Sequence, residues 1–197
     1  MTTIWTVGHS THAADDFIKL LNGADITAIA DVRSSPYSRH NPQFNRETLR
    51  TKLRQEGIDY VFLGDGLGAR SDDPRHYDGN RVVYARLAQS APFQAAIDRV
   101  IAGTKKYNVA LMCAEKDPLT CHRTILVARD LTDRGIAVRH IGADGEIETH
   151  DEALERLMKM LNMNPDDMYT PREDSIRAAY HEQELRIAYV RPAEPRS

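Results

Sequence analysis

Short apolar runs alternate with amphipathic segments along the first three quarters of the chain. The runs are rich in Val, Ile, Leu and Ala, which is typical of buried strands, and they span residues 4–7, 26–32, 58–63, 108–112 and 137–141. Between them, apolar residues recur at helical spacing over residues 13–21, 46–56, 82–88, 93–102 and 124–131. This alternation predicts an α/β fold, with an open, mostly parallel sheet of about five strands and helices on both faces.

The last part of the chain has a different pattern. A short strand at residues 146–149 precedes an amphipathic helix at residues 150–161. Beyond residue 162, prolines interrupt the sequence at positions 165, 171, 192 and 195, and only residues 175–187 have helical spacing. We therefore predict an α/β domain over residues 1–162 and a C-terminal helical arm over residues 163–197. The arm is expected to pack on the domain or on a partner subunit, which would make a homodimer.

One segment inside the expected domain lacks clear periodicity. Residues 64–81 contain glycines at positions 64, 66, 68 and 79 and several aspartates. A loop of this length in a compact domain is usually a lid or a binding loop. We expect residues 64–68 to form a mobile loop.

Composition and charge narrow the class of protein. The chain has 197 residues, of which 41% are hydrophobic and 28% charged, and only two cysteines. No apolar run is long enough to cross a bilayer, and the N-terminus lacks a basic leader and an apolar signal core. We expect a cytoplasmic protein with reduced thiols and no membrane partner. The net charge of -3 argues against a protein that coats nucleic acid with its whole surface.

The charge distribution leaves one nucleic-acid hypothesis open. Between Arg33 and Arg54 there are six basic residues and a single acidic one, with Tyr37, His40 and Phe44 interleaved. This stretch is either a solvated helix face with a loop or a local platform for phosphates and stacked bases. A non-catalytic nucleic-acid-binding module is therefore one alternative function.

Candidate chemistry is concentrated in residues 113–123. A thiol and a carboxylate follow the fourth apolar run, and a second thiol, an imidazole and a guanidinium open the next helical segment. The pair Asp117-Pro118 is typical of a helix start, and a thiol in the first turn beside Arg123 has a lowered pKa. We predict a catalytic group made of Cys113, Glu115, Cys121 and His122.

The other predicted strand ends supply further polar residues. Ligands of open parallel sheets bind outside the carboxyl ends of the strands. On this ground we predict a ligand-binding group made of His9, Ser10, Asp31, Arg33 and Arg123, with His140 at the end of the fifth strand. The leading hypothesis is an enzyme that acts on a phosphorylated small molecule, a nucleotide or a nucleic-acid component, with Arg33 and Arg123 binding the anion.

Other chemistries fit residues 113–123 to different degrees. A cysteine phosphatase loop needs Arg six residues after the thiol, where this chain has Leu119, and a redox pair would favour the spacing Cys-x-x-Cys. Glu115 or Asp31 could act as base or nucleophile toward a nucleoside, without a thiol. We expect no cofactor, but one alternative is a metal site with Cys113, Cys121 and His122 as ligands and His9 or Glu115 as the fourth.

Several motifs together resemble the DUF488 family, a domain of unknown function. They are Thr6-Val-Gly-His-Ser10, Asp31-Val-Arg33, Leu63-Gly-Asp-Gly-Leu-Gly68, Cys113-Ala-Glu115 and Pro118-x-x-Cys121-His-Arg123. The resemblance extends to His140-Ile141, and Ala69 departs from it where the loop often has another glycine. It implies one α/β domain and points to the same residues, but it implies no reaction.

Overall fold

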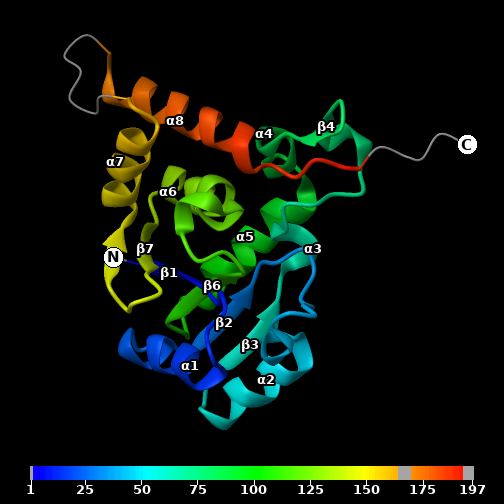
Figure 1. The fold of residues 1–197 in the computed structure, drawn as a ribbon, viewed down its shortest axis with the longest axis vertical. Helices are drawn as coiled ribbons and strands as arrows, with labels where there is room; N and C mark the ends of the chain where they lie inside the picture. The colour runs from blue at the N-terminus through cyan, green and yellow to red at the C-terminus, as the bar shows by residue number, and fades with distance from the viewer. Residues whose placement is uncertain (1, 164–169, 193–197) are drawn as a thin grey trace, which may run out of the picture.

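The computed structural model describes residues 2–163 and 170–192, and its centre is a six-stranded sheet (Figure 1). The order is β3-β2-β6-β1-β7-β8. The strands are β1 (Thr3–Gly8), β2 (Ala28–Asp31), β3 (Asp59–Phe62), β6 (Val109–Cys113), β7 (Ala137–Ile141) and β8 (Ile147–Thr149). All neighbours are parallel except β7 and β8. The α/β prediction is confirmed, and the short strand expected at residues 146–149 is β8, which pairs antiparallel with β7 as the sixth strand of the sheet.

Helices α1 (Ala14–Gly23) and α2 (Arg46–Gln55) cover one face of the sheet. The 3-10 turn η1 (Pro42–Phe44) precedes α2. Their buried side chains share a core with Ile29 of β2 and Met112 of β6. Ile29 and Met112 point to this face because successive side chains of a strand point to opposite faces of the sheet.

A second group of helices covers the opposite face (Figure 1). It comprises α5 (Ala91–Gly103), the 3-10 turn η3 (Pro118–Thr120), the π-helix η4 (Arg123–Ala128), α6 (Arg129–Asp133), α7 (His150–Met160) and α8 (Arg172–Ile187). Val109, Leu111 and Cys113 of β6 belong to this core, whereas Ala110 and Met112 belong to the other. The period of two therefore directs the Cys113 side chain toward the second group of helices.

The glycine-rich segment is more regular than the sequence predicts. It contains α3 (Gly64–Leu67), the 3-10 turn η2 (Pro74–His76), a hairpin of β4 (Tyr77–Asp78) and β5 (Arg81–Val82), and α4 (Tyr84–Ala88). Residues 64–67 form a short helix rather than a loop, and this helix packs closely on α5. The packing requires glycine, because a Cβ on Gly66 would lie 2.7 Å from the carbonyl oxygen of Pro92. The helix predicted from residue 82 begins at Tyr84, since Arg81 and Val82 pair in the hairpin.

Helix α8 and the segment after it pack on the rest of the chain. The side-chain amide of Gln183 donates to the Leu119 carbonyl at 2.7 Å, and the backbone N–H of Val82 donates to the Tyr189 carbonyl at 2.9 Å. In Figure 1, α8 crosses above α6 and the chain then runs past α4 and β4. Pro165 and Pro195 of the predicted arm lie outside the described residues.

Within residues 2–163 and 170–192, no helix is both long enough and apolar enough to span a membrane.

Candidate functional site

The loop after β6 lies against the loop after β1. The backbone N–H groups of His9 and Ser10 donate to the carbonyls of Cys113 and Ala114, both at 2.9 Å. The approach is so close that a Cβ on Gly8 would lie 1.9 Å from the carbonyl oxygen of Glu115. Glycine is therefore required at the end of β1, and this contact positions the Glu115 loop.

A capped turn brings the second thiol back toward the first. The Asp117 carboxylate accepts from the Leu119 N–H at 2.9 Å, and Pro118 begins the 3-10 turn η3. This confirms the helix start predicted from Asp117-Pro118, although the turn is 3-10 and Cys121 after it is extended, with φ -134° and ψ 142°. Cys121 directly follows this turn, and its sulfur lies within 4.8 Å of that of Cys113 at the end of β6.

Two sulfurs and one ring nitrogen converge in the group Cys113, Cys121 and His122, which we call the sulfur cluster. Nδ1 of His122 lies 3.7 Å from Sγ of Cys113 and 3.8 Å from Sγ of Cys121, and all three atoms lie within 4.8 Å of one another. Nε2 of the same ring is 3.0 Å from the carbonyl oxygen of Val32. A carbonyl only accepts, so Nε2 carries a proton, and Nδ1 faces both sulfurs. Burial opposes a charged ring, but Cys121, Glu115 and the Val32 carbonyl outweigh it and raise the pKa of His122.

Electrostatics distinguishes the two thiols. Burial raises the pKa of Cys121, but hydrogen bonding from Cys113, the charge of Arg123 and the His122 ring together hold it well below its usual value. The backbone N–H of Arg123 also donates to Cys121 Sγ at 3.4 Å. Burial and the neighbouring Cys121 raise the pKa of Cys113 well above its usual value. A thiolate in this cluster is therefore favoured at Cys121.

Glu115 lies at the edge of the sulfur cluster. Its Oε2 lies 3.0 Å from Cys121 Sγ, and burial followed by the charge on Cys121 raises the pKa of the Glu115 carboxyl. The four residues predicted as a catalytic group are thus adjacent in space.

A cavity of about 370 Å³ opens in front of these four residues. Its other walls include Arg70, Tyr84 and, from the segment around the end of α8, Ile187 and Tyr189. The cavity gives a small molecule access to side chains that are otherwise buried.

Arg33 is bound to Asp31 at the end of β2. Its Nε and Nη2 donate to the two carboxylate oxygens at 2.9 and 2.6 Å, and Nη2 also donates to the Phe44 carbonyl at 2.9 Å. The Tyr60 hydroxyl also donates to Asp31, at 2.7 Å. Arg33 and Asp31 are 5% and 0% exposed, so this is a buried ion pair with most of its hydrogen bonds satisfied.

His9 completes that ion-pair group. Its Nε2 accepts from Arg33 Nη1 at 3.1 Å, its Nδ1 donates to the Ser10 carbonyl at 2.9 Å, and its ring stacks on Phe44 at 4.3 Å. Burial lowers the pKa of His9 from 6.5 to about 4, so the ring is neutral at neutral pH. The side chain holds Arg33 in place.

The Arg123 guanidinium also binds oxygen atoms of the protein. It donates to the carbonyls of Glu115 at 2.8 Å and Lys116 at 3.3 Å, so it supports the loop between the two cysteines. It lies close to the end of β1, because a Cβ on Gly8 would be 3.1 Å from Arg123 Nη2. Arg33, bonded to His9, and Arg123, near Gly8, therefore lie at the same edge of the sheet, and their binding of an anion stays a prediction.

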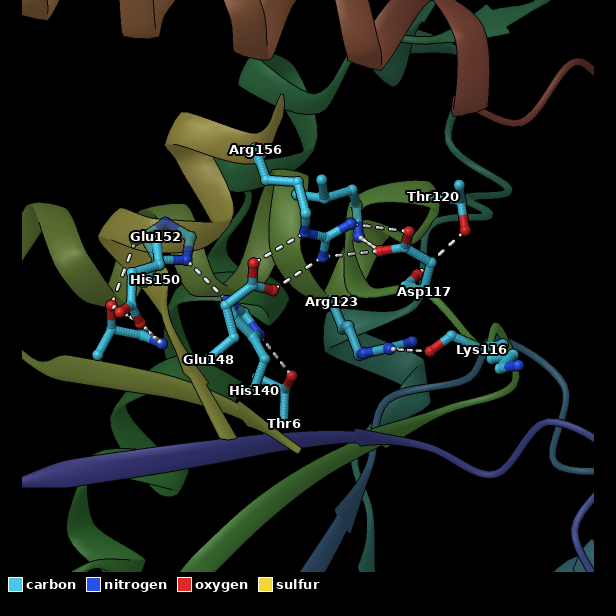
Figure 2. Close-up of polar contacts among 12 residues, drawn as sticks. Thr6, Lys116, Asp117, Thr120, Arg123, His140, Glu148, His150, Glu152 and Arg156 are labelled. Carbon is cyan, nitrogen blue, oxygen red and sulfur yellow. Dashed lines mark hydrogen bonds and ion pairs between the residues drawn. The ribbon is translucent and has the colours of Figure 1, made fainter. Parts of the chain in front are cut away.

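Two other residues of the expected set lie elsewhere. Ser10, with φ 47°, lines a separate cavity of about 980 Å³ together with His12 and Glu148. His140 belongs to a chain of hydrogen bonds, drawn in part in Figure 2, which we call the histidine chain. Thr6 Oγ1 is 2.7 Å from His140 Nδ1, His140 Nε2 is 3.0 Å from His150 Nδ1, and His150 Nε2 is 2.6 Å from the Tyr180 hydroxyl.

Sequence reasoning missed Val32, Tyr60, Arg70 and Tyr84. Val32 acts through its backbone carbonyl, which has no sequence signal. Tyr84 lies in a helical pattern, where an aromatic residue indicates core packing. Only the fold shows that these residues adjoin the predicted ones.

The family model described as "Domain of unknown function DUF488" matches residues 13–129. The chain belongs to the DUF488 family. The matched segment includes the Asp31–Arg33 pair and the whole sulfur cluster, whereas His9, Ser10 and the C-terminal arm of this DUF488 protein lie outside it. The comparisons with curated proteins and with solved structures gave no match.

Proposed function

We propose that this DUF488 protein binds one thiophilic divalent transition metal ion, such as zinc, through Cys113, Cys121 and His122. The spacing of the ligand atoms carries the proposal. Zinc–sulfur bonds of about 2.3 Å and zinc–nitrogen bonds of about 2.0–2.1 Å at tetrahedral angles place S and N about 3.5–3.6 Å apart. The observed distances from Nδ1 to the two sulfurs, 3.7 and 3.8 Å, need only a small contraction.

The surroundings of the three ligands support the same proposal. Metal-binding histidines usually donate their second ring N–H to a carbonyl or carboxylate, which fixes the ring and leaves the ligating nitrogen unprotonated. The Val32 carbonyl occupies that position for His122. The Arg123 N–H donates to Cys121 Sγ, which stabilises a thiolate ligand.

The cavity supports a catalytic rather than a purely structural metal. Structural zinc sites have four protein ligands, whereas catalytic sites have three and an accessible fourth position. Here Glu115 and a molecule in the cavity are the two available occupants of that position. A metal ion so placed would polarise a carbonyl or phosphoryl oxygen of a bound substrate.

The test is metal binding by the full-length protein, reduced and freed of metal with a chelator. Titration with Co²⁺ should give sulfur-to-cobalt charge-transfer absorption that saturates near one equivalent. Cys121→Ser and His122→Gln should each weaken cobalt at least about 100-fold, because each removes a ligand. His181→Gln, at an exposed position of α8, is the matched control and should bind as wild type. Absence of the absorption in wild type, and of metal in protein purified without chelator, would refute the proposal.

A second candidate function keeps the same residues as a thiol enzyme acting on a phosphorylated ligand. The observation that favours it is the lowered pKa of Cys121 beside Glu115, with Sγ lining the cavity. The number of thiols needed separates the two candidates. A nucleophile requires Cys121 alone, so Cys113→Ser would retain turnover of a nucleotide panel, whereas a metal centre requires both sulfurs.

A further inference from the structure

The cavity contains a buried phenol that no protein group uses. Tyr84 is 3% exposed and lines the cavity with the sulfur cluster. Its backbone N–H donates to Glu184 at 2.7 Å, but its hydroxyl makes no hydrogen bond with any residue that the structure describes. Buried tyrosine hydroxyls usually have a partner. Tyr84 borders the cavity, so a molecule bound there can supply that partner.

The Tyr84 hydroxyl is suited to donate to a ligand. A tyrosine hydroxyl ordinarily has a pKa of about 10, so it keeps its proton at physiological pH and can donate a hydrogen bond. Tyr84 lines the cavity beside the sulfur cluster, so its phenol can donate a hydrogen bond to an oxygen atom of a ligand there.

Arg70 supplies a positive charge at the same cavity. Of the two arginines that line it, Arg33 is paired with Asp31, whereas Arg70 forms no ion pair within residues 2–163 and 170–192. The Arg70 guanidinium lies over the ring of Tyr189 at 4.8 Å, and its backbone N–H donates to Ser34 Oγ at 3.0 Å. These two contacts hold the residue at the wall and leave the guanidinium N–H groups for a ligand.

We propose that the cavity binds a small oxyanion, a phosphate or a carboxylate group, through the Tyr84 hydroxyl and the Arg70 guanidinium, beside the metal ion of the sulfur cluster. The inference rests on the proposed metal site. Arg70 would supply the charge, Tyr84 a directed hydrogen bond, and the segment carrying Ile187 and Tyr189 the outer wall. The cavity of about 370 Å³ suits a small-molecule ligand.

The test uses the cobalt-substituted full-length protein. Inorganic phosphate and acetate are titrated separately, and the visible cobalt spectrum reports the Kd of each anion. Tyr84→Phe and Arg70→Gln should each raise the Kd by about tenfold, because each loses one strong interaction. Cobalt affinity should stay unchanged, since neither residue is a metal ligand. The ratio of the two anion affinities distinguishes a phosphate site from a carboxylate site.

Matched controls are Tyr107→Phe and Arg75→Gln, which change the same residue types outside this cavity. Anion affinity lost in the two cavity variants and retained in the two controls supports the inference. Bound cobalt with no anion binding, or with equal Kd values in all variants, overturns it and leaves the metal site standing. Wild type that binds no cobalt overturns both. Arg70 is exposed, so its variant decides the question even where Tyr84→Phe fails to fold.

Discussion

The sulfur cluster and the histidine chain are both buried groups built around histidine, yet they differ in one respect. In the histidine chain every ring nitrogen has a partner at 2.6–3.0 Å. In the sulfur cluster Nδ1 of His122 faces only two sulfurs, at 3.7 and 3.8 Å, and the group borders a cavity. No other group of three or more potential metal ligands converges among the described residues. Burial of a histidine therefore does not by itself indicate a site, and the proposed metal site rests on the convergence of three potential ligand atoms beside a cavity.

The largest expected effect on the stability of the metal-free protein comes from removing the middle residue of the histidine chain. His140→Ala removes the ring between Thr6 and His150, which leaves a cavity and two buried polar atoms without partners. We expect the free energy of unfolding to fall by about 3–4 kcal/mol, measured by urea denaturation. Cobalt affinity at the sulfur cluster should not change, and a parallel loss of cobalt binding would show that the two regions are not independent.

Low pH should destabilise the metal-free protein through His150 of the histidine chain. Burial lowers the pKa of His150 from 6.5 to about 4, so between these values the unfolded chain binds a proton that the folded chain does not. The free energy of unfolding therefore decreases as pH falls through this window, by about 3 kcal/mol for this group. Urea denaturation at several pH values checks the slope. His150→Gln should show a shallower slope, and an unchanged one would contradict the assignment.

The smallest effect on the stability of the metal-free protein is expected at the sulfur cluster. Without metal, Cys113→Ser should change the free energy of unfolding by less than about 1 kcal/mol, because a hydroxyl can still bond to the His122 ring. With zinc at 1,000 times its Kd, wild type should gain about 4 kcal/mol, and the variant should not. A loss well above 2 kcal/mol in the metal-free variant would instead indicate that Cys113 serves packing.

Much of the fold follows from local patterns. The five apolar runs became β1, β2, β3, β6 and β7, and the run before Cys113 became the fully buried β6. The start at Asp117-Pro118 was visible because capping chemistry acts over three residues. The helix at residues 64–67 was not visible, because its glycines are explained by contacts with α5, far away in sequence.

The candidate site shows the same division between local and distant information. The sequence by itself determined that both thiols, Glu115 and His122 lie within ten residues after a buried strand. Only the tertiary structure decided that His122 joins the sulfurs while His140 joins His150 and Tyr180, and that the guanidinium groups of Arg33 and Arg123 bind protein oxygens. The physical reason is that the partners which orient these side chains, such as the Val32 carbonyl 90 residues from His122, are neighbours only once the strands have paired.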